Sequence, residues 1–572
     1  MNSFCVVILA LFLQVINSQF TLLVFGDIGE FEEFKDAQGS SDADPSVFKL
    51  DETAKTCTKL AGTWKGYLNF LDKVINPDIN SQNKFSCNAD SVAILGDLIY
   101  PEVKSDTIKT LRAYKLKAGE ARYPGWRARV VCALFVLRDV LNTINCPANS
   151  KNPFGSKDAN GLLNKVDLIL GNHSFDVDYT VEADYSLRLT NYNAYSFNTA
   201  TPAKDISASQ SKLSYSDMIN FPVMKVQTIG DVRIEFLDFI ILPLSCYLNS
   251  NPKTEDQYNK CWAFSYYGIF YTFQQALTYT ERFIQALGSF TQTANWRVLR
   301  AHHPFMNIEG YPSDNSYFWK VAIDSSGNTI MDLVKQNNIN LFLASHHHSS
   351  QVLVYPWANL PQTKTVYSTY DVSGTIGFPT KVFDLQGKEC PKGKCPNDSY
   401  YRCYYNDIFV NGKSEIKVCD NVSRSMTFRL NPSAPKNLIT IVQGGSGRKL
   451  DIIENDQKTP AALIFGRAVV HGGCQIVFNK RTFKVTFFEG EKIVFTLTSV
   501  DSLIDNYPVI ENYVKAKLQN SLGRTEISSA NSTDPVVYSI NSFNYTDYVD
   551  VNSGFILRFG YLLLAGLIYF FI

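Results

Sequence analysis

The strongest constraint on the fold is a set of short apolar runs that each end in a small cluster of polar residues. The runs are FTLLVFGDIG, DSVAILGDLIY, KVDLILGNHSF, WRVLRAHHPF and INLFLASHHHSS. Helical patterns separate several of them, as in GWRARVVCALFVLRDVLNTI and NTIMDLVKQNN. Alternation of buried strands with helices predicts an α/β core. Because open α/β sheets bind ligands beyond the carboxyl ends of their strands, the polar clusters mark a candidate site.

Histidine is concentrated in these clusters, which hold six of the chain's seven histidines. An expression tag or low-complexity tract is the alternative for the triple histidine, but this run is internal and follows an apolar strand. Oxygen and nitrogen donors without cysteine suit hard or borderline metal ions. A lone Gly-Asp turn or histidine is usually structural, whereas the whole set favours a metal centre. The donors at the strand ends are Asp27, Asp97, Tyr100, Asn172, His173, His302, His303, His346, His347 and His348.

The order of these motifs resembles that of the metallophosphoesterases. Most of that superfamily has Asp-x-His at the first strand, whereas Gly29 stands here in the place of the histidine. Tyr100, three residues after the second aspartate, compensates for the missing ligand. The motifs GDxG, GDxxY, GNH, HxP and a paired histidine together resemble the purple acid phosphatases over about residues 20 to 500. The segment HGGCQIVFNKRTFKVTFFEGEKIVF is similar to the closing β-hairpin of the mammalian-type enzymes.

This resemblance implies a four-layer αββα sandwich of two mixed β-sheets flanked by helices, with long insertions. It also implies a dinuclear metal centre of Fe(III) and a divalent ion, which is Fe, Zn or Mn. Asp97 would bridge the ions. The Fe(III) ligands would be Asp27, Tyr100 and His348, and the divalent-ion ligands would be Asn172, His302 and His346.

The triple histidine needs a bend in the chain. Alternate residues of an extended segment point to opposite sides, so His346 and His348 reach one centre only if the turn between them bends. His347 then takes no part as a ligand. His302 is preferred to His303 as a ligand because the family's ligand lies two residues before the proline.

The implied activity is that of an acid phosphatase, in which a metal-bound hydroxide attacks a phosphate monoester. Two cations neutralise and orient the phosphate dianion, and a trivalent ion makes hydroxide available in acid. The expected catalytic residues are His173 and His303; His173 is suited to contact the phosphoryl oxygens or protonate the leaving group. The superfamily usually has Asp or Glu after GNH, where this chain has Ser174, with Asp176 and Asp178 close by.

Two other functions fit parts of the pattern. One is a noncatalytic, membrane-anchored scaffold with the same fold, resembling the glideosome-associated proteins. The complete ligand set weighs against it, because a scaffold has no physical reason to keep seven ligand-type residues. The other is a phosphodiesterase or lipid phosphoesterase of the wider superfamily, against which Gly29 and Tyr100 argue.

The two ends of the chain predict export and anchoring. MNSFCVVILALFLQVINS resembles a cleaved signal peptide, and FILRFGYLLLAGLIYFFI resembles a glycolipid (GPI) anchor signal, with a membrane-spanning helix as the alternative. We therefore expect a membrane-anchored protein of the secretory pathway, located extracellularly, at the cell surface, or in a lysosome or vacuole. The expected parts are a signal peptide at 1–18, a catalytic domain at 19–502, a stalk at 503–552 and the anchor signal at 553–572. Long insertions are expected at 175–235 and 250–290, and a Cys-rich one at about 375–435.

Composition agrees with this compartment. The 54 basic residues equal the 54 acidic ones, so no basic surface for nucleic acid is indicated, and the expected partners are a phosphate monoester and the membrane. Sequons occur at Asn397, Asn421, Asn531 and Asn544, while Asn172, as a ligand, is not expected to carry a glycan. Removal of Cys5 with the signal peptide leaves eleven of twelve cysteines, which should mostly form disulfides with one left free. Cysteines close enough in sequence to pair are 132 and 146, 246 and 261, and the group 390, 395, 403 and 419, although spacing leaves the connectivity open.

Overall fold

The protein is described by a computed structural model. The described residues are 18–29, 48–51, 56–59, 65–75, 85–100, 124–159, 161–175, 221–250, 254–261, 272–305, 318, 321–324, 326–357, 409–410, 413–414, 418–420, 425–430, 432–433, 435, 437–448, 450, 462–468, 470–490 and 492–501. Residues 1–17, the expected stalk and anchor, and all four sequons lie outside these ranges. Within them, no helix is both long and apolar enough to span a bilayer.

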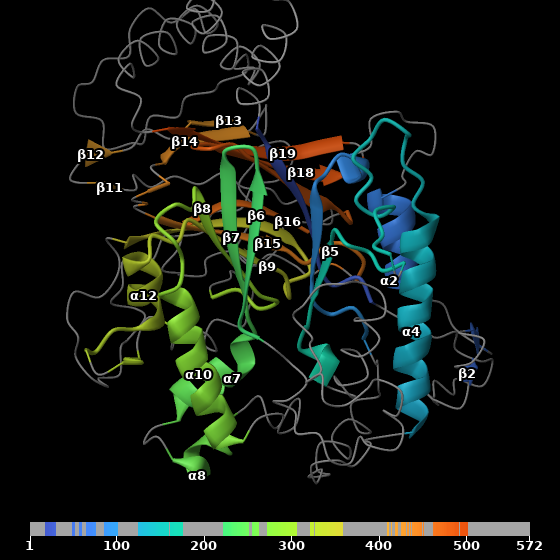
Figure 1. The fold of residues 1–572 in the computed structure, drawn as a ribbon, viewed down its shortest axis with the longest axis horizontal. Helices are drawn as coiled ribbons and strands as arrows, with labels where there is room; N and C mark the ends of the chain where they lie inside the picture. The colour runs from blue at the N-terminus through green and yellow to red at the C-terminus, as the bar shows by residue number, and fades with distance from the viewer. Residues whose placement is uncertain are drawn as a thin grey trace, which may run out of the picture.

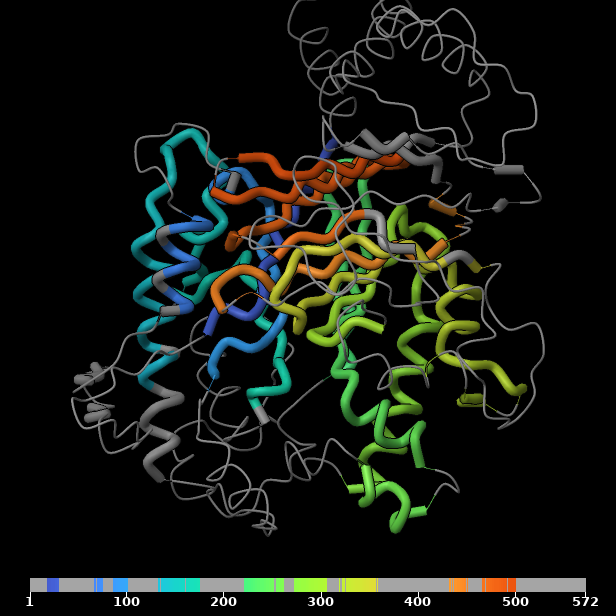
Figure 2. The backbone as a smooth tube through the Cα atoms, turned by 180° about the vertical axis from the view of Figure 1, so that it is seen from behind, coloured from blue at the N-terminus to red at the C-terminus, as the bar shows by residue number. Residues whose placement is uncertain are grey.

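Two mixed β-sheets form the centre of the fold. The eight-stranded sheet has the order β13 (Val418–Asp420), β14 (Ser425–Leu430), β19 (Lys492–Asp501), β18 (Phe483–Glu489), β17 (Gly473–Phe478), β1 (Phe20–Phe25), β4 (Ser91–Leu95) and β5 (Val166–Ile169). The seven-stranded sheet has the order β16 (Ala462–Arg467), β10 (Ser350–Pro356), β15 (Asn437–Gln443), β9 (Leu341–Ala344), β8 (Trp296–Arg300), β7 (Val232–Asp238) and β6 (Val223–Ile229). Figure 2 shows the C-terminal strands beside the first ones, as the antiparallel pairing of β1 with β17 requires.

Helices cover the outer face of each sheet. On the eight-stranded sheet lie α2 (Lys65–Asn69), its π-helical continuation η2 (Phe70–Ile75) and α4 (Pro124–Thr143). On the seven-stranded sheet lie α7 (Ile241–Asn249), α10 (Phe273–Leu287) and α12 (Ile330–Gln336), while the short α8 (Glu255–Tyr258) contacts α7. Figure 1 shows the two helical layers on opposite flanks of the sheets. The expected α/β sandwich of two mixed sheets flanked by helices is therefore confirmed.

The position of β1 between two cores explains why its sequence is an apolar run. Side chains alternate between the two faces of a strand. Leu22 and Val24 enter the core between the sheets, whereas Leu23 and Phe25 enter the core beneath the helices. Both faces are buried, so every position except Thr21 is apolar. Between the sheets, the ring of Trp296 lies 5.7 Å from that of Phe478 on the opposite sheet.

Short elements complete the described structure. Two small hairpins pair β2 (Phe48–Asp51) with β3 (Thr56–Lys59), and β11 (Phe409–Val410) with β12 (Lys413–Ser414). Single 3-10 turns occur at η3 (Phe85–Cys87) and η4 (His173–Phe175).

The predicted insertions at 175–235 and 250–290 are wrong in part. Strands β6 and β7 belong to the seven-stranded sheet, and α10 belongs to its helical layer. Strand β6 shows a half-exposed pattern, as an edge strand does, so its apolar signal is weak. In the Cys-rich segment at about 375–435, β14 pairs in parallel with β19 and extends the eight-stranded sheet.

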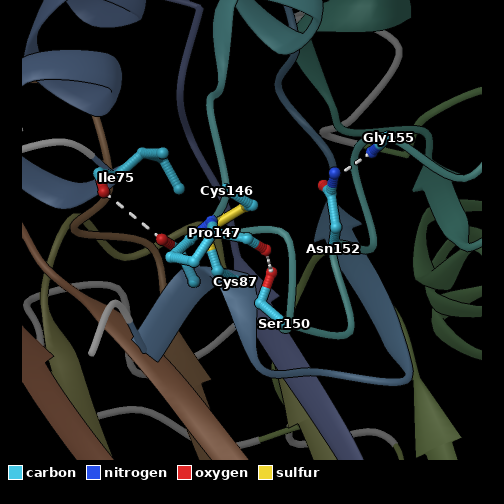
Figure 3. The surroundings of a disulfide bond; sticks show 8 residues. Ile75, Cys87, Cys146, Pro147, Ser150, Asn152 and Gly155 are labelled. Atoms are coloured by element: carbon cyan, nitrogen blue, oxygen red, sulfur yellow. Dashed lines mark hydrogen bonds between the residues drawn. A yellow bond between two sulfur atoms is a disulfide. The ribbon is translucent and has the colours of Figure 1, made fainter. Parts of the chain in front are cut away.

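One of the two predicted cysteine pairs outside the Cys-rich segment is wrong. Cys246 and Cys261 are bonded, but Cys146 is bonded to Cys87 instead of Cys132 (Figure 3). Cys132 lies inside α4, about 16 Å along the helix axis from the last residue of the helix at a rise of 1.5 Å per residue. Because a disulfide tolerates at most about 7 Å between Cα atoms, the chain after α4 would have to fold straight back along the helix to bring Cys146 to Cys132. Cys132 is disulfide-bonded elsewhere, and Cys474 is a buried free thiol.

Candidate metal centre

The candidate site lies where the carboxyl ends of strands from both sheets meet. Asp27 follows β1, Asp97 and Tyr100 follow β4, and Asn172 follows β5, all in the eight-stranded sheet. His302 follows β8, and His346 and His348 follow β9, in the seven-stranded sheet. The seven residues predicted as ligands therefore come from five strand ends.

One half of the site is built around the Tyr100 hydroxyl group. This hydroxyl donates a hydrogen bond to Asp27 Oδ1 and lies 3.2 Å from His348 Nε2. His348 Nε2 lies 3.5 Å from the same carboxylate oxygen of Asp27. A phenol, a carboxylate and an imidazole thus converge on one point.

The other half is built around the Asn172 side chain. Asn172 Oδ1 lies 2.8 Å from His302 Nε2 and 2.9 Å from His346 Nδ1. His302 Nε2 lies 3.3 Å from Asp97 Oδ2, and donor atoms of Asp27, Asp97 and His302 all lie within 4.8 Å of one another. Asp97 therefore lies between the two halves, where a bridging ligand would be.

Sharp turns in the backbone aim three of these side chains. Asp27, Asp97 and His346 have φ values of 56°, 48° and 70°. Non-glycine residues adopt this left-handed conformation rarely, at a cost of roughly 1–3 kcal/mol, and they concentrate at functional sites. At His346 the turn supplies the bend that the histidine run needs for its first and third members to face one centre.

Two glycines allow the strand ends to approach closely. A Cβ atom on Gly171 would lie 1.9 Å from Asp97 Oδ1. A Cβ atom on Gly96, where φ is +90°, would lie 2.5 Å from His302 Nδ1. The glycines of the Gly-Asp and Gly-Asn motifs are therefore needed for space beside the ligands.

The orientation of His302 fits a metal ligand. Its Nδ1 lies 2.7 Å from the carbonyl oxygen of Leu95, to which it donates, so the neutral ring carries its lone pair on Nε2. Metal-binding histidines usually hold their second nitrogen in this way. Nε2 then faces two further acceptors, the side-chain oxygens of Asn172 and Asp97. A proton on Nε2 fills this position when His302 is charged, and a metal ion could take its place among the three acceptors, so the residues present fit a metal ion.

Burial and charge set the protonation of the ligands. Burial would raise the pKa of Asp97, but the charges of His302 and His173 hold it well below its usual value. Burial and neighbouring imidazoles hold the pKa of His346 well below the usual range, so its ring is neutral and able to bind a metal at pH 7. Although burial lowers it, the Asp97 carboxylate raises the pKa of His302 to about 8.

Burial, reinforced by the Asp27 and Asp97 carboxylates, raises the pKa of Tyr100 well above its usual value. Without a cation the side chain is therefore a neutral phenol. A metal ion would have to displace its proton to bind the phenolate.

The two predicted catalytic histidines lie in different places. The His173 backbone N–H donates to Asp97 Oδ1 at 3.0 Å, and its ring centroid lies 4.5 Å from that of Tyr100. Ser174 stands where the superfamily usually has a carboxylate. Its hydroxyl accepts a hydrogen bond from the Gly171 N–H at 3.1 Å. Asp176 and Asp178 lie outside the described residues.

His303 lies deeper than His173 and beside the Asn172 half. Its ring centroid lies 4.2 Å from that of His346, and the side chain is 7% exposed. Burial holds the pKa of His303 well below its usual range. The middle member of the histidine run, His347, is also buried.

A sixth strand end was not predicted as part of the site. Strand β15 runs parallel to β9 and ends in GGSGR, which reaches the Asp27 half. The Arg448 N–H donates to the Asp27 carbonyl oxygen at 2.8 Å, and its guanidinium carbon lies 3.7 Å from the Tyr100 ring centroid. The sequence feature that could have revealed this strand end is the apolar run NLITIVQ followed by GGSGR. The segment GGSGR contains no typical metal ligand, so it did not stand out.

No protein-family model matches the sequence, and no curated protein matches it. Among solved structures, the chain is similar to purple acid phosphatase PPD1 from yellow lupin (Lupinus luteus) seeds, with 11% identity and a TM-score of 0.36 over 90% of this chain and 58% of that one. It is also similar to GAP50, the anchor in the inner membrane complex of Plasmodium (10% identity, TM-score 0.35, 91% and 100% covered). A third similar structure is a dimetal phosphatase from Danio rerio (11% identity, TM-score 0.32, 84% and 99% covered). The chain thus spans 58% of the length of the lupin phosphatase, and these likenesses are too distant to transfer an activity.

Proposed function

We propose that this protein is a metal-dependent phosphatase that hydrolyses phosphate monoesters. The observation that carries the proposal is the continuous network of seven oxygen and nitrogen donors at five strand ends, divided into two halves with Asp97 between them. Paired metal ions would supply positive charge to orient the phosphate dianion and would acidify the attacking water. A pair of neighbouring sites with a shared carboxylate is the arrangement that such chemistry needs.

The donor chemistry suggests how the ions would be divided. We assign Fe(III) to the half with Asp27, Tyr100 and His348, because a phenolate and a carboxylate are hard ligands that suit a trivalent ion. We assign a divalent ion to the half with Asn172, His302 and His346. Asp97 would serve both ions.

His173 is the residue we propose as the proton donor to the leaving group. Its backbone is fixed by Asp97, and its ring packs against Tyr100, yet the residue is only half-buried. A substrate can therefore reach it beside the ligands. General-acid assistance is worth roughly a hundredfold to ten-thousandfold in rate, so His173→Ala should lower kcat by at least a hundredfold with metal content retained.

The experiment that tests the proposal measures phosphate release from a simple aryl phosphate together with metal content. We expect activity that requires metal and is lost in Asp97→Asn. A protein that binds two metal ions but releases no phosphate would refute the enzyme and would favour a noncatalytic scaffold.

We further propose that the protein follows the secretory pathway and is anchored at a membrane. The Cys87–Cys146 and Cys246–Cys261 disulfides support an oxidising compartment. Treatment of membranes with a phosphatidylinositol-specific phospholipase tests the anchor. Release of the protein would support a glycolipid at its C-terminus, and continued attachment would support a spanning helix instead.

A further inference from the structure

His303 lies among the ligands of the Asn172 half in a way that its expected catalytic role does not explain. Ring nitrogens of His302, His303 and His346 all lie within 4.8 Å of one another. The His303 ring is tilted by 39° to that of His346 at a centroid distance of 4.2 Å. Three imidazoles therefore surround one position, whereas the sequence motifs indicate only two histidine ligands for this half.

The Nε2 atom of His303 is a second and independent observation. Within the part of the chain that the structure describes, this buried atom has no hydrogen-bond partner. Leaving a buried polar atom unsatisfied costs roughly 1–3 kcal/mol, and native proteins rarely leave one without an ion or a water. A metal ion at the meeting point of the imidazoles would account for the orphaned nitrogen.

We propose that His303 is a third imidazole ligand of the divalent ion, and that this half of the centre selects zinc over manganese. The inference rests on the proposed dinuclear site and extends it. Imidazole nitrogen suits Zn²⁺, while a site of carboxylate, carbonyl and water suits Mn²⁺. Adding His303 to His302, His346 and Asn172 gives three nitrogen donors and one amide oxygen, besides the shared Asp97. Each added imidazole moves the preference towards zinc.

The experiment uses the full chain, stripped of metal and titrated with Zn²⁺ or Mn²⁺ against a chromophoric chelator. The variants are His303→Ala and, to keep the ring volume, His303→Phe. The matched control is His347→Ala, since His347 is a buried histidine of the adjacent run whose ring lies 5.0 Å from that of His346 and which is not one of the three clustered imidazoles. Substitution with Co²⁺ adds a visible spectrum that reports the number of nitrogen ligands.

We expect both His303 variants to bind zinc at least about a hundredfold more weakly, because even outer-shell partners are worth tenfold to a hundredfold in metal affinity. Manganese affinity should change less, so the zinc-to-manganese ratio should fall, and the Co²⁺ spectrum should shift. His347→Ala should stay within about threefold of the wild type.

Unchanged zinc affinity and an unchanged Co²⁺ spectrum in both His303 variants would overturn the proposal. If phosphate release fell at the same time, His303 would be a substrate contact. Equal losses of affinity in the His303 and His347 variants would also overturn it, because they would indicate general damage to the histidine turn. Metal affinity and the Co²⁺ spectrum can be measured without activity, so an inactive protein that still shows the His303-specific loss would refute the phosphatase and leave the ligand assignment standing.

Discussion

A buried group of four charges beneath the site should hold the two halves of the ligand set together. Arg300, on β8, forms a bidentate pair with Asp238 on the neighbouring β7, with distances of 2.6 and 2.7 Å. Arg300 also reaches across to the other sheet, where its Nη1 lies 2.9 Å from Asp167 Oδ2 on β5. Lys225 on β6 contacts the second oxygen of Asp167 at 2.5 Å. The group is neutral overall, and Asp167 alone lies on the eight-stranded sheet.

Asp167→Asn and Asp238→Asn remove the same charge from the same group, so each is the control for the other. Either substitution leaves one buried positive charge uncompensated, which costs about 3–5 kcal/mol of unfolding free energy. Arg300 and Asp238 are both 0% exposed, so the loss of unfolding free energy in Asp238→Asn should lie near the upper end of this range. Lys225 is 20% exposed and can turn towards water, so Asp167→Asn should fall near the lower end.

The two variants should differ in metal binding. Asp167 lies on β5, the strand that Asn172 follows, and Arg300 lies two residues before His302. The ion pair between the sheets therefore helps to set the 2.8 Å contact of Asn172 with His302. We expect Asp167→Asn to weaken zinc binding roughly tenfold to a hundredfold, the size of effect seen when a supporting contact of a metal ligand is lost. Asp238→Asn, which breaks a contact within one sheet, should change zinc affinity by less than about threefold.

Urea unfolding of metal-free protein measures the stability change, and chelator competition measures zinc affinity. Destabilisation below about 1 kcal/mol in both variants would show that the group is hydrated and unimportant for stability. Equal losses of zinc affinity in the two variants would refute the reasoning about the inter-sheet contact, because both would then act through general loosening.

Three further outcomes can be checked. Gly171→Ala should abolish binding of both metals, since its Cβ would displace Asp97, whereas Gly288→Ala meets only ordinary contacts at 3.5 Å or more and should leave metal content unchanged, as elemental analysis would show. Because the pKa of His302 in the metal-free protein is about 8 and the metal needs the unprotonated ring, zinc affinity should rise about tenfold per pH unit below about pH 8 and level off above it; a pH-independent affinity would contradict this. Tyr100→Phe should remove the visible absorption expected of an Fe(III)–tyrosinate while leaving the fold, and a wild-type protein that holds iron without this band would contradict the assignment.

The strands that carry the site could be predicted because they are buried on both faces. The apolar runs before Asp27 and His346 are too short for a buried helix and so favour a strand with no exposed side, and the polar residues that follow them then stand out. The need for a bend at the histidine run followed from strand geometry alone, and the left-handed φ of His346 provides it.

Other features depend on contacts between distant residues and left a weak signal. The pairing of Cys87 with Cys146 joins residues 59 apart in sequence, and no spacing rule selects it over Cys132. The role of Arg448 depends on β15 lying beside β9, which its own sequence does not reveal. The buried group of four charges could not be predicted for the same reason. In the sequence, Asp167 and Arg300 are isolated polar residues within apolar strands, and only the packing of the sheets brings them together.

The division of donors between the sheets gives the site a physical property that neither sheet has alone. The eight-stranded sheet supplies only oxygen donors, from two carboxylates, a phenol and an amide, whereas the seven-stranded sheet supplies only imidazoles. A mixed oxygen and nitrogen site therefore exists only when the sheets are packed face to face, with Trp296 and Arg300 fixing their relative position. A metal ion bound there would cross-link the sheets, so binding and packing of the two layers are coupled. Substitutions deep between the sheets can thus alter metal affinity without touching a ligand.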